Sequence, residues 1–366
     1  MEVRTRDFIH TKDDMYFAST NYLHPEDRII SFLRYIPDEN GEREKNGKRY
    51  SKVGSDEAFA YLKENHPEYL YHSEVANVDM MGVPTDKVDE IIRPEDRLKI
   101  IREGGDEKVS DDVREKLIDL SDFFYYIAGI DYDHLGISGS TCPGLQKAEI
   151  SDLDFVVYGL ENHKKAINAF KKYHDTEVEV GEGESKRKIV LNPIQNEFWQ
   201  HLFNKRIKDD SLTKEEFCWY EARKFNRGVI RGTLFDILCT RNMDEVEGEY
   251  GDTKYEPLGY SQIECTITND LKSMDNPAVY EISDVKYLDG IKENITELAS
   301  LTHTYAGEVL EGERVIARGK VEKVITKGKE PSYRILVGST RESIGEYIKL
   351  IEIPKWILNQ YNENYD

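Results

Sequence analysis

The sequence contains few cysteines, and their spacing excludes the sites that cysteines usually build. Four cysteines in 366 residues form no Cys-x-x-Cys pair that could begin a zinc knuckle, and they are too sparse for a disulfide framework. Nine histidines are also scattered, without the His-x-His or His-Glu-x-x-His spacing of a metal site. We therefore expect buried free thiols at the four cysteine positions, Cys142, Cys218, Cys239 and Cys265.

Long apolar segments are also missing. The longest apolar stretch, near residues 123–130, covers about eight residues, whereas a membrane-spanning helix needs roughly 20. The first residues, MEVRTRDFIHTKDD, lack the apolar centre of a secretory signal peptide. We expect a soluble, cytoplasmic protein without a membrane partner.

Basic residues are outnumbered by acidic ones. The chain has 50 Lys and Arg against 71 Asp and Glu, which gives a net charge of −21. Binding to nucleic acid through the overall field is excluded, because counterion release requires cations clustered against the phosphates. Contact with a polynucleotide would need a local basic patch.

The length and the local patterns predict three domains. In residues 1–105, alternation over 30–36 predicts a strand, 50–53 a partner strand, and Ser55 the N-cap of a helix that reaches about residue 65. This is an accessory α+β domain, which the pair Gly104-Gly105 separates from the next domain.

Residues 106–254 show the alternating strands and helices of an α/β domain. Helical periodicity covers 113–127, and strands are predicted up to Gly139-Ser140, over 150–158 and over 232–239. Helices are predicted over 161–173, around 194–207, and after the capping box formed by Thr213 and Glu216. Residues 255–366 instead hold short runs between turn residues, which predict a β-rich domain, either an antiparallel sheet or a small five-stranded barrel.

One segment of the α/β domain has a pattern that points to chemistry. Gly139-Ser140 is followed, after eleven residues, by Asp152-Leu153-Asp154-Phe155. On a strand, positions 152 and 154 project from one face about 7 Å apart, and their carboxylates repel unless a cation lies between them. Such oxygen ligands suit Mg²⁺, and a tight Gly-Ser turn can direct backbone N–H groups at a triphosphate.

This pattern resembles that of the DNA polymerase β-like nucleotidyltransferase superfamily, in which a Gly-Ser or Gly-Gly pair precedes a strand with two alternating aspartates. The resemblance implies a central mixed sheet with helices, and an enzyme that transfers a nucleoside monophosphate from an NTP, such as ATP, to an acceptor hydroxyl and releases pyrophosphate. It implies that Asp152 and Asp154 hold two Mg²⁺ ions, or Mn²⁺, and that Gly139 and Ser140 bind the triphosphate. Members add a third carboxylate from a later strand, where this chain offers Asp236.

Basic residues in two places extend the candidate site. Arg223, Arg227 and Arg231 lie between the predicted capped helix and the Asp236 strand. They could face the triphosphate, whose leaving pyrophosphate needs cations, or they could simply favour a helix C-terminus.

The window 314–334 has seven cations against Glu322 and Glu330, and predicts a surface for RNA or DNA. Its alternative interpretation is a solvated strand whose lysines protect a sheet edge.

Two other functions remain open at this stage. One is a catalytically inactive nucleotidyltransferase fold that serves as a binding module. The other is an enzyme that nucleotidylates a protein or a small molecule.

Overall fold

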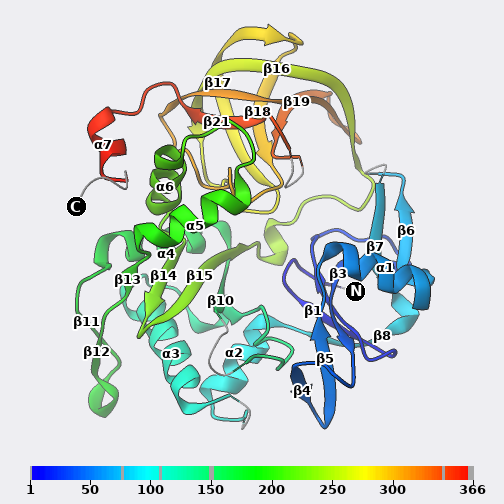
Figure 1. Ribbon diagram of the computed structural model, residues 1–366, viewed down its shortest axis with the longest axis vertical. Helices are drawn as coiled ribbons and strands as arrows, with labels where there is room; N and C mark the ends of the chain where they lie inside the picture. The colour runs from blue at the N-terminus through cyan, green and yellow to red at the C-terminus, as the bar shows by residue number, and fades with distance from the viewer. Residues whose placement is uncertain (1, 76–77, 107–108, 148–151, 340–342, 362–366) are drawn as a thin grey trace. The chain divides into compact units, whose positions relative to one another are not determined.

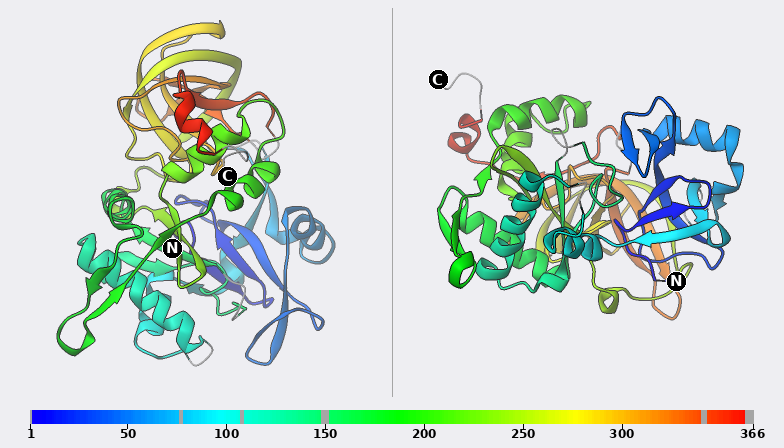
Figure 2. Two further views of the ribbon diagram at one scale, coloured as in Figure 1. Left: turned by 60° about the vertical axis from the view of Figure 1, so that its left-hand side comes forward. Right: turned by 90° about the horizontal axis from the view of Figure 1, so that it is seen from below.

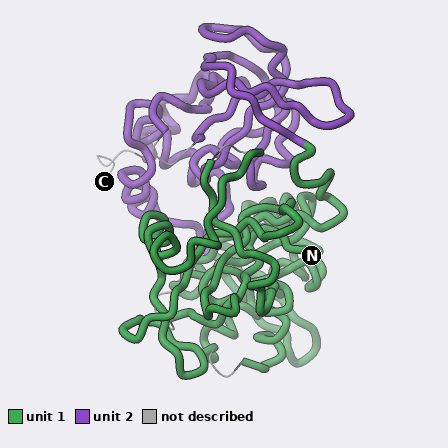
Figure 3. The backbone as a smooth tube through the Cα atoms, turned by 90° about the vertical axis from the view of Figure 1, so that its right-hand side faces the viewer, with its two compact units in different colours: residues 1–191, 229–252 green, residues 192–228, 253–366 purple. Residues whose placement is uncertain are grey.

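The computed structural model describes residues 2–75, 78–106, 109–147, 152–339 and 343–361. The chain forms two compact units, the first from residues 1–191 and 229–252 and the second from 192–228 and 253–366 (Figure 3). Both contain strands and helices, so the fold is mixed α and β, as predicted (Figure 1). None of the described helices is both long enough and apolar enough to cross a membrane.

The first unit begins with an N-terminal sheet of short antiparallel strands. Its main path has the order β4-β5-β3-β2-β1-β8, and β7 joins β3 to β6. The bounds are β1 Phe8–Thr11, β2 Tyr16–Ser19, β3 Arg28–Pro37, β4 Arg43–Lys45, β5 Lys48–Lys52, β6 Leu70–Ser73, β7 Val78–Pro84, β8 Val88–Ile92 and helix α1 Ser55–Asn65. The predicted pairing of the strand over 30–36 with that over 50–53 is confirmed by β3 and β5.

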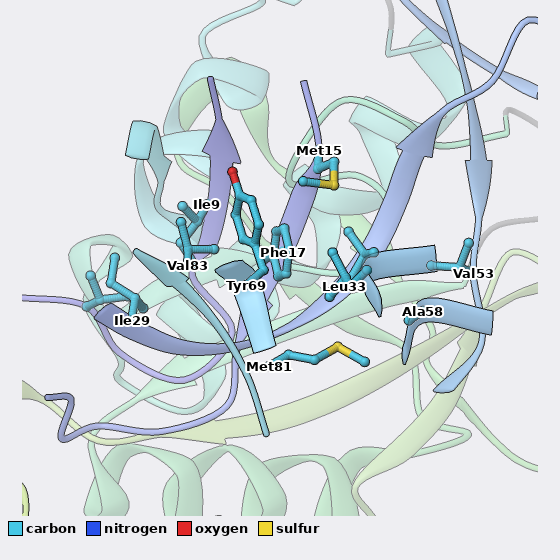
Figure 4. Close-up of a cluster of buried hydrophobic side chains, with 12 residues drawn as sticks. Ile9, Met15, Phe17, Ile29, Leu33, Val53, Ala58, Tyr69, Met81 and Val83 are labelled. Carbon is cyan, nitrogen blue, oxygen red and sulfur yellow. The ribbon is translucent and has the colours of Figure 1, made fainter. Parts of the chain in front are cut away.

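The interior of the N-terminal sheet is a cluster of apolar side chains. Phe17 and Tyr69 stack there with ring centroids 5.3 Å apart, and Figure 4 shows them side by side. The predicted cap of α1 is wrong by one residue: Gly54 is the N-cap, and its N–H donates to the Glu57 carboxylate at 3.4 Å. Ser55 is instead the first helical residue.

The rest of the first unit is built around a central sheet. Its elements are helices α2 Pro94–Arg102, α3 Asp111–Asp122 and α4 Leu160–Tyr173, a π-helical turn Phe123–Ile127, and strands β9 Leu135–Ile137, β10 Leu153–Tyr158, β11 Val178–Val180, β12 Arg187–Ile189, β14 Arg227–Ile230 and β15 Thr233–Thr240. In this sheet β15 lies between β14 and β10, and β9 follows β10. Because β10 is parallel to β15 and antiparallel to β9, the sheet is mixed, as predicted.

The N-terminal sheet packs directly on the loop that follows β9. Phe8, Tyr16, Tyr35 and Tyr50 form one buried cluster with Cys142 and Leu145 of that loop. This shared core explains why residues on both sides of the predicted boundary at 105 belong to one compact unit.

The second unit has a barrel-like sheet and helices. Its elements are β13 Asn192–Pro193, α5 Asn196–Arg206, α6 Lys214–Arg223, β16 Thr253–Asn269, β17 Ala278–Gly290, β18 Ile295–Ser300, β19 Arg314–Thr326, β20 Ser332–Val337, β21 Tyr347–Leu350 and α7 Lys355–Asn359. The order β16-β17-β18-β20-β19 returns to β16, so these strands close a ring, and β21 adds to β19. Figure 2 shows them, in yellow and orange, curving around one another.

The predicted capping box at Thr213 and the predicted burial of the cysteines are both confirmed. Thr213 caps α6, because its hydroxyl accepts from Glu216 N–H at 3.2 Å and the Glu216 carboxylate accepts from Thr213 N–H at 2.8 Å. All four cysteines are buried thiols that form no disulfide. Segment 192–228 groups with the C-terminal strands, whereas the sequence placed it in the α/β domain.

Candidate active site

Two of the predicted aspartates lie side by side on the central sheet. In the parallel pairing of β10 with β15, Asp154 is the register partner of Asp236. Side chains of partners on adjacent strands project from the same face of a sheet, so both carboxylates share one face. Asp152 is exposed and lies one residue before β10 begins. The predicted neighbour relation between the two strands is therefore confirmed.

The Gly139-Ser140 turn contacts this pair of aspartates. Gly139 has φ +60°, and a Cβ there would lie 1.8 Å from Oδ2 of Asp154, so only glycine fits. Ser138 N–H donates to the Asp154 carbonyl at 2.9 Å, and Leu145 N–H closes the turn on the Ser140 carbonyl at 2.9 Å. The loop is thus fixed directly against the Asp154 carboxylate.

The local field disfavours negative charge on Asp154. Burial, and then the neighbouring carboxylate of Asp236, raise the pKa of Asp154 to about 6, and Asp152 contributes in the same direction. The cations of Arg6 and Lys52 oppose this rise of the Asp154 pKa without cancelling it. Excess negative charge of this kind is what a bound cation would neutralise.

The three aspartates suit a divalent cation by their donor chemistry. Carboxylate oxygens are the ligands that Mg²⁺ prefers, and the excess charge around Asp154 favours a cation. The ligand atoms of Asp152, Asp154 and Asp236 are not all within 4.8 Å of one another. The one group of three that is so close, within the described residues, is Asp13, His66 and Glu68.

The cluster of Asp13, His66 and Glu68 is already engaged by protein groups. Asp13 Oδ2 accepts from the Tyr69 hydroxyl at 2.6 Å and from Lys87 Nζ at 3.2 Å. Lys87 Nζ also lies 3.5 Å from the Glu68 carboxylate. These contacts favour a structural role that links strand and loop segments of the N-terminal sheet.

The three predicted arginines have partners of their own. Arg223 pairs with Glu313 at 2.6 Å and lies over the Trp219 ring at 4.5 Å, and Arg227, the first residue of β14, lies 5.7 Å from the Phe198 ring centroid. Arg231, in the first unit, pairs with carboxylates of α3, namely Glu115 at 2.9 Å and Asp119. A triphosphate role for these arginines stays a prediction.

Sequence reasoning missed the residues that the N-terminal region adds to the site. Arg6, with φ +73°, accepts a hydrogen bond from the Ser138 hydroxyl on its carbonyl at 3.0 Å. Tyr35 of β3 is buried, which raises its pKa, and the Ser140 side chain is close enough to oppose that rise of the Tyr35 pKa. These residues are about a hundred positions or more from the motif, and no local pattern in the sequence connects them with it.

Comparison with known proteins gives a relative for nearly the whole chain. It is 41% identical over 362 residues to the uncharacterized protein MJ1086 of Methanocaldococcus jannaschii, a match that covers 96% of this chain and 99% of that protein. The chain belongs to the MJ1086 family. No protein-family model and no solved structure matches it.

The basic window of this MJ1086-family chain lies on β19 and β20. Arg318 and Lys320 project outward from β19, where Lys320 pairs in register with Tyr260, a side chain that is 42% exposed. The Arg318 guanidinium lies 5.6 Å from the same ring. By contrast, Arg334 is buried and bonds to Glu322 at 2.8 Å, so its charge is already neutralised.

Proposed function

We propose that the protein is a Mg²⁺-dependent nucleotidyltransferase that transfers a nucleoside monophosphate from an NTP, such as ATP, to an acceptor hydroxyl. The observation that supports it most is the register of β10 with β15, which sets Asp154 beside Asp236, together with the contact of Gly139 on Asp154. A like-charged pair beside a tight Gly-Ser turn has no evident structural purpose. Its geometry suits metal-assisted phosphoryl chemistry.

In this proposal each residue has a defined part. Asp152, Asp154 and Asp236 would hold Mg²⁺, or Mn²⁺, which when bound lowers the pKa of the acceptor hydroxyl and neutralises phosphate charge. Gly139 and Ser140 orient the phosphates of the nucleotide. The acceptor hydroxyl loses its proton to solvent, and its oxygen bonds to the α-phosphorus in line with the leaving group. The bond between the α-phosphorus and the bridging oxygen of the β-phosphate breaks, and pyrophosphate departs.

Incubating the full chain with labelled NTP and Mg²⁺ tests the proposal. We expect release of pyrophosphate and transfer of label, both abolished by Asp154→Asn and by Asp236→Asn in protein that still melts cooperatively. Gly139 is left intact in both variants, so the loop conformation is preserved. Absence of NTP binding and turnover with either metal would reject the proposal and leave a catalytically inactive binding module.

Nucleic acid is the acceptor that one observation favours. Small five-stranded barrels such as OB-folds present basic and aromatic faces to oligonucleotides, and β16 and β19 expose Tyr260 beside Arg318 and Lys320. We therefore propose that RNA or DNA is the partner and that the 314–334 segment binds it. We also propose a cytoplasmic location for the protein. Label that appears instead on protein or on a small molecule would identify the other kind of nucleotidylating enzyme.

A further inference from the structure

Three cations lie on neighbouring strands of the N-terminal sheet near Tyr35, and we call them the Lys52 cluster: Arg34 of β3, whose guanidinium is 5.9 Å from the Phe32 ring centroid, Arg43 of β4 and Lys52 of β5. Lys52 is the register partner of Tyr35, so their side chains share a face. The Arg43 guanidinium lies 5.4 Å from the Tyr35 ring centroid. The carbonyl of Arg34 accepts from Val53 N–H at 3.0 Å, which joins β3 to the residue that follows Lys52.

The Lys52 cluster borders the loop and the carboxylates of the candidate site. Arg43 donates to the Leu145 carbonyl, at the end of the loop that starts with Gly139-Ser140. Tyr35, at the centre of the cluster, packs in one buried cluster with Cys142 and Leu145 of the same loop. Partial burial, together with the charges of Arg34 and Arg43, lowers the pKa of Lys52, while Asp154 and Asp152 act in the opposite direction. Cations and carboxylates therefore act on one another in this region.

The arginines of the Lys52 cluster contact a carbonyl or aromatic rings rather than paired carboxylates, as Arg43 does with the Leu145 carbonyl and the Tyr35 ring. Within the described residues no carboxylate lies within 4.0 Å of Arg34, Arg43 or Lys52. Lys48, four residues before Lys52 on the same strand, does pair, with Asp14. Like charges placed together without a directly paired carboxylate are unfavourable, and this is a common arrangement where a polyanion binds.

We propose that the Lys52 cluster binds the β- and γ-phosphates of the nucleotide, so that the N-terminal sheet forms part of the NTP site. This inference rests on the proposed function, and it adds residues to it that the nucleotidyltransferase motif does not contain. The position of the cluster indicates the kind of anion. Arg43 and Tyr35 contact the loop that begins with Gly139-Ser140, so a phosphate chain bound on that turn would have the three cations next to it. A polyphosphate matches three clustered cations in charge and in compactness.

Binding of inorganic tripolyphosphate to the full chain in EDTA tests this site without metal or turnover. We expect Lys52→Met and Arg34→Gln to weaken binding by about tenfold or more each, as for loss of a charge-assisted hydrogen bond. The matched control Lys63→Met, at an exposed position of α1, should leave the affinity unchanged. Asp154→Asn should retain or tighten the binding, since it removes negative charge.

The outcomes separate this inference from the proposed function. Tripolyphosphate binding that is indifferent to Lys52→Met and Arg34→Gln, in a chain that still transfers nucleotide, would reject the cluster alone. Binding that depends on the cluster, in a chain without turnover in either metal, would reject nucleotidyl transfer and leave a polyphosphate site. A single-stranded oligonucleotide that binds in place of tripolyphosphate would assign the cluster to the acceptor backbone and overturn the proposal.

Discussion

At the scale of single residues, the candidate site depends on a glycine and on neighbouring carboxylates that repel each other. Gly139 is needed both for its positive φ and for its contact on Asp154. Asp154 is held beside another carboxylate in surroundings that favour its neutral form. Both features reduce stability in the absence of a ligand, which is typical of binding and catalytic sites.

Gly139→Ala should abolish nucleotide binding, because the added Cβ would meet Asp154 Oδ2 at 1.8 Å. Gly129→Ala is the matched control, since Gly129 also has positive φ, +68°, but no atom within 4 Å of the added Cβ. Both variants incur the backbone strain, of about 1 kcal/mol. Only Gly139→Ala should lose NTP binding in a titration, and equal losses in both variants would contradict a specific contact.

Metal affinity should follow the ionisation of Asp154. Since the pKa of Asp154 is about 6, protons compete with Mn²⁺ or Mg²⁺ below that pH. We expect affinity to fall by about tenfold per pH unit below pH 6 if a single proton is displaced, and to level off above pH 7. Mn²⁺ titrations between pH 5 and pH 8 measure this. An affinity that is constant over this range would exclude Asp154 as a ligand.

Asp7 should make the fold less stable as pH rises. Asp7 is fully buried, its Oδ1 has no hydrogen-bond partner among the described residues, and burial raises its pKa to about 7. The folded state therefore favours the neutral acid. The free energy of unfolding should decrease by about 1.4 kcal/mol per pH unit between roughly pH 4 and pH 7 from this group.

Asp7→Asn should remove that part of the pH dependence. Urea unfolding at pH 5 and at pH 8 gives the change in the free energy of unfolding between the two pH values. This change is compared between wild type and variant, because Asp154 contributes to it in the same direction in both proteins. Asp56→Asn, an exposed position in the first turn of α1, is the control. If the Asp7→Asn variant kept the wild-type pH dependence of the free energy of unfolding, Asp7 would be ionised in the folded state.

At the scale of elements, short-range signals predicted helices α1, α3, α4, α5 and α6 and the longer strands, and missed most of the short strands. The capping box of Thr213 begins α6 where the sequence placed it, because capping depends on residues only three positions apart. The helices α2 and α7 were missed, and so were twelve strands: β1, β2, β4, β6, β7, β8, β11, β12, β13, β14, β18 and β21. The few residues of these strands are stabilised by pairing with other strands, such as β18 with β20, rather than by a local pattern.

The two helix starts provide a matched pair of substitutions. Thr213→Ala should destabilise the second unit by about 1 kcal/mol, because its hydroxyl caps Glu216 N–H. Ser55→Ala should be near neutral, since Ser55 lies inside α1 and not at its cap. Urea unfolding of both variants checks the difference. A larger loss for Ser55→Ala would contradict the observed start of α1.

The outward face of β19 should determine affinity for nucleic acid. We expect Arg318→Ala with Lys320→Ala to weaken binding of the full chain to single-stranded RNA and to reduce the salt slope by about 0.7 for each phosphate that the variant no longer neutralises. Lys286→Ala on β17 is the control, because Lys286 is already paired with Glu264 at 3.2 Å. Binding that is unaffected by the double substitution, or absent at low salt, would remove nucleic acid from the proposal.

At the scale of the whole molecule, the chain passes between its two units three times, at 191/192, 228/229 and 252/253. The segment 192–228 supplies contacts that the C-terminal strands need. Lys224 Nζ donates to the Thr304 carbonyl at 2.8 Å, and the Tyr220 hydroxyl accepts from Leu350 N–H at 2.7 Å. The predicted domain 255–366 is therefore only part of a compact unit.

A fragment of residues 255–366 should not fold as it does in the full chain. It lacks Lys224, whose charge opposes the rise that burial causes in the pKa of the fully buried Glu308, and it lacks the apolar surface of α6. We expect weak near-ultraviolet circular dichroism and no cooperative melting. A sharp transition like that of the full chain would show that the predicted domain is independent.

The sequence by itself determined the Gly139-Ser140 turn, the alternating aspartates and the apolar strand around Asp236, because each depends on neighbours a few residues apart. Strand periodicity also placed Arg318 and Lys320 on one face. Only the tertiary structure decided that Asp154 pairs in register with Asp236, and that Arg6, Tyr35 and Lys52 lie at the site. Such pairings join residues far apart in the chain. They form because apolar side chains of the N-terminal sheet and of the loop after β9 are buried in one core, and no local sequence pattern encodes this contact.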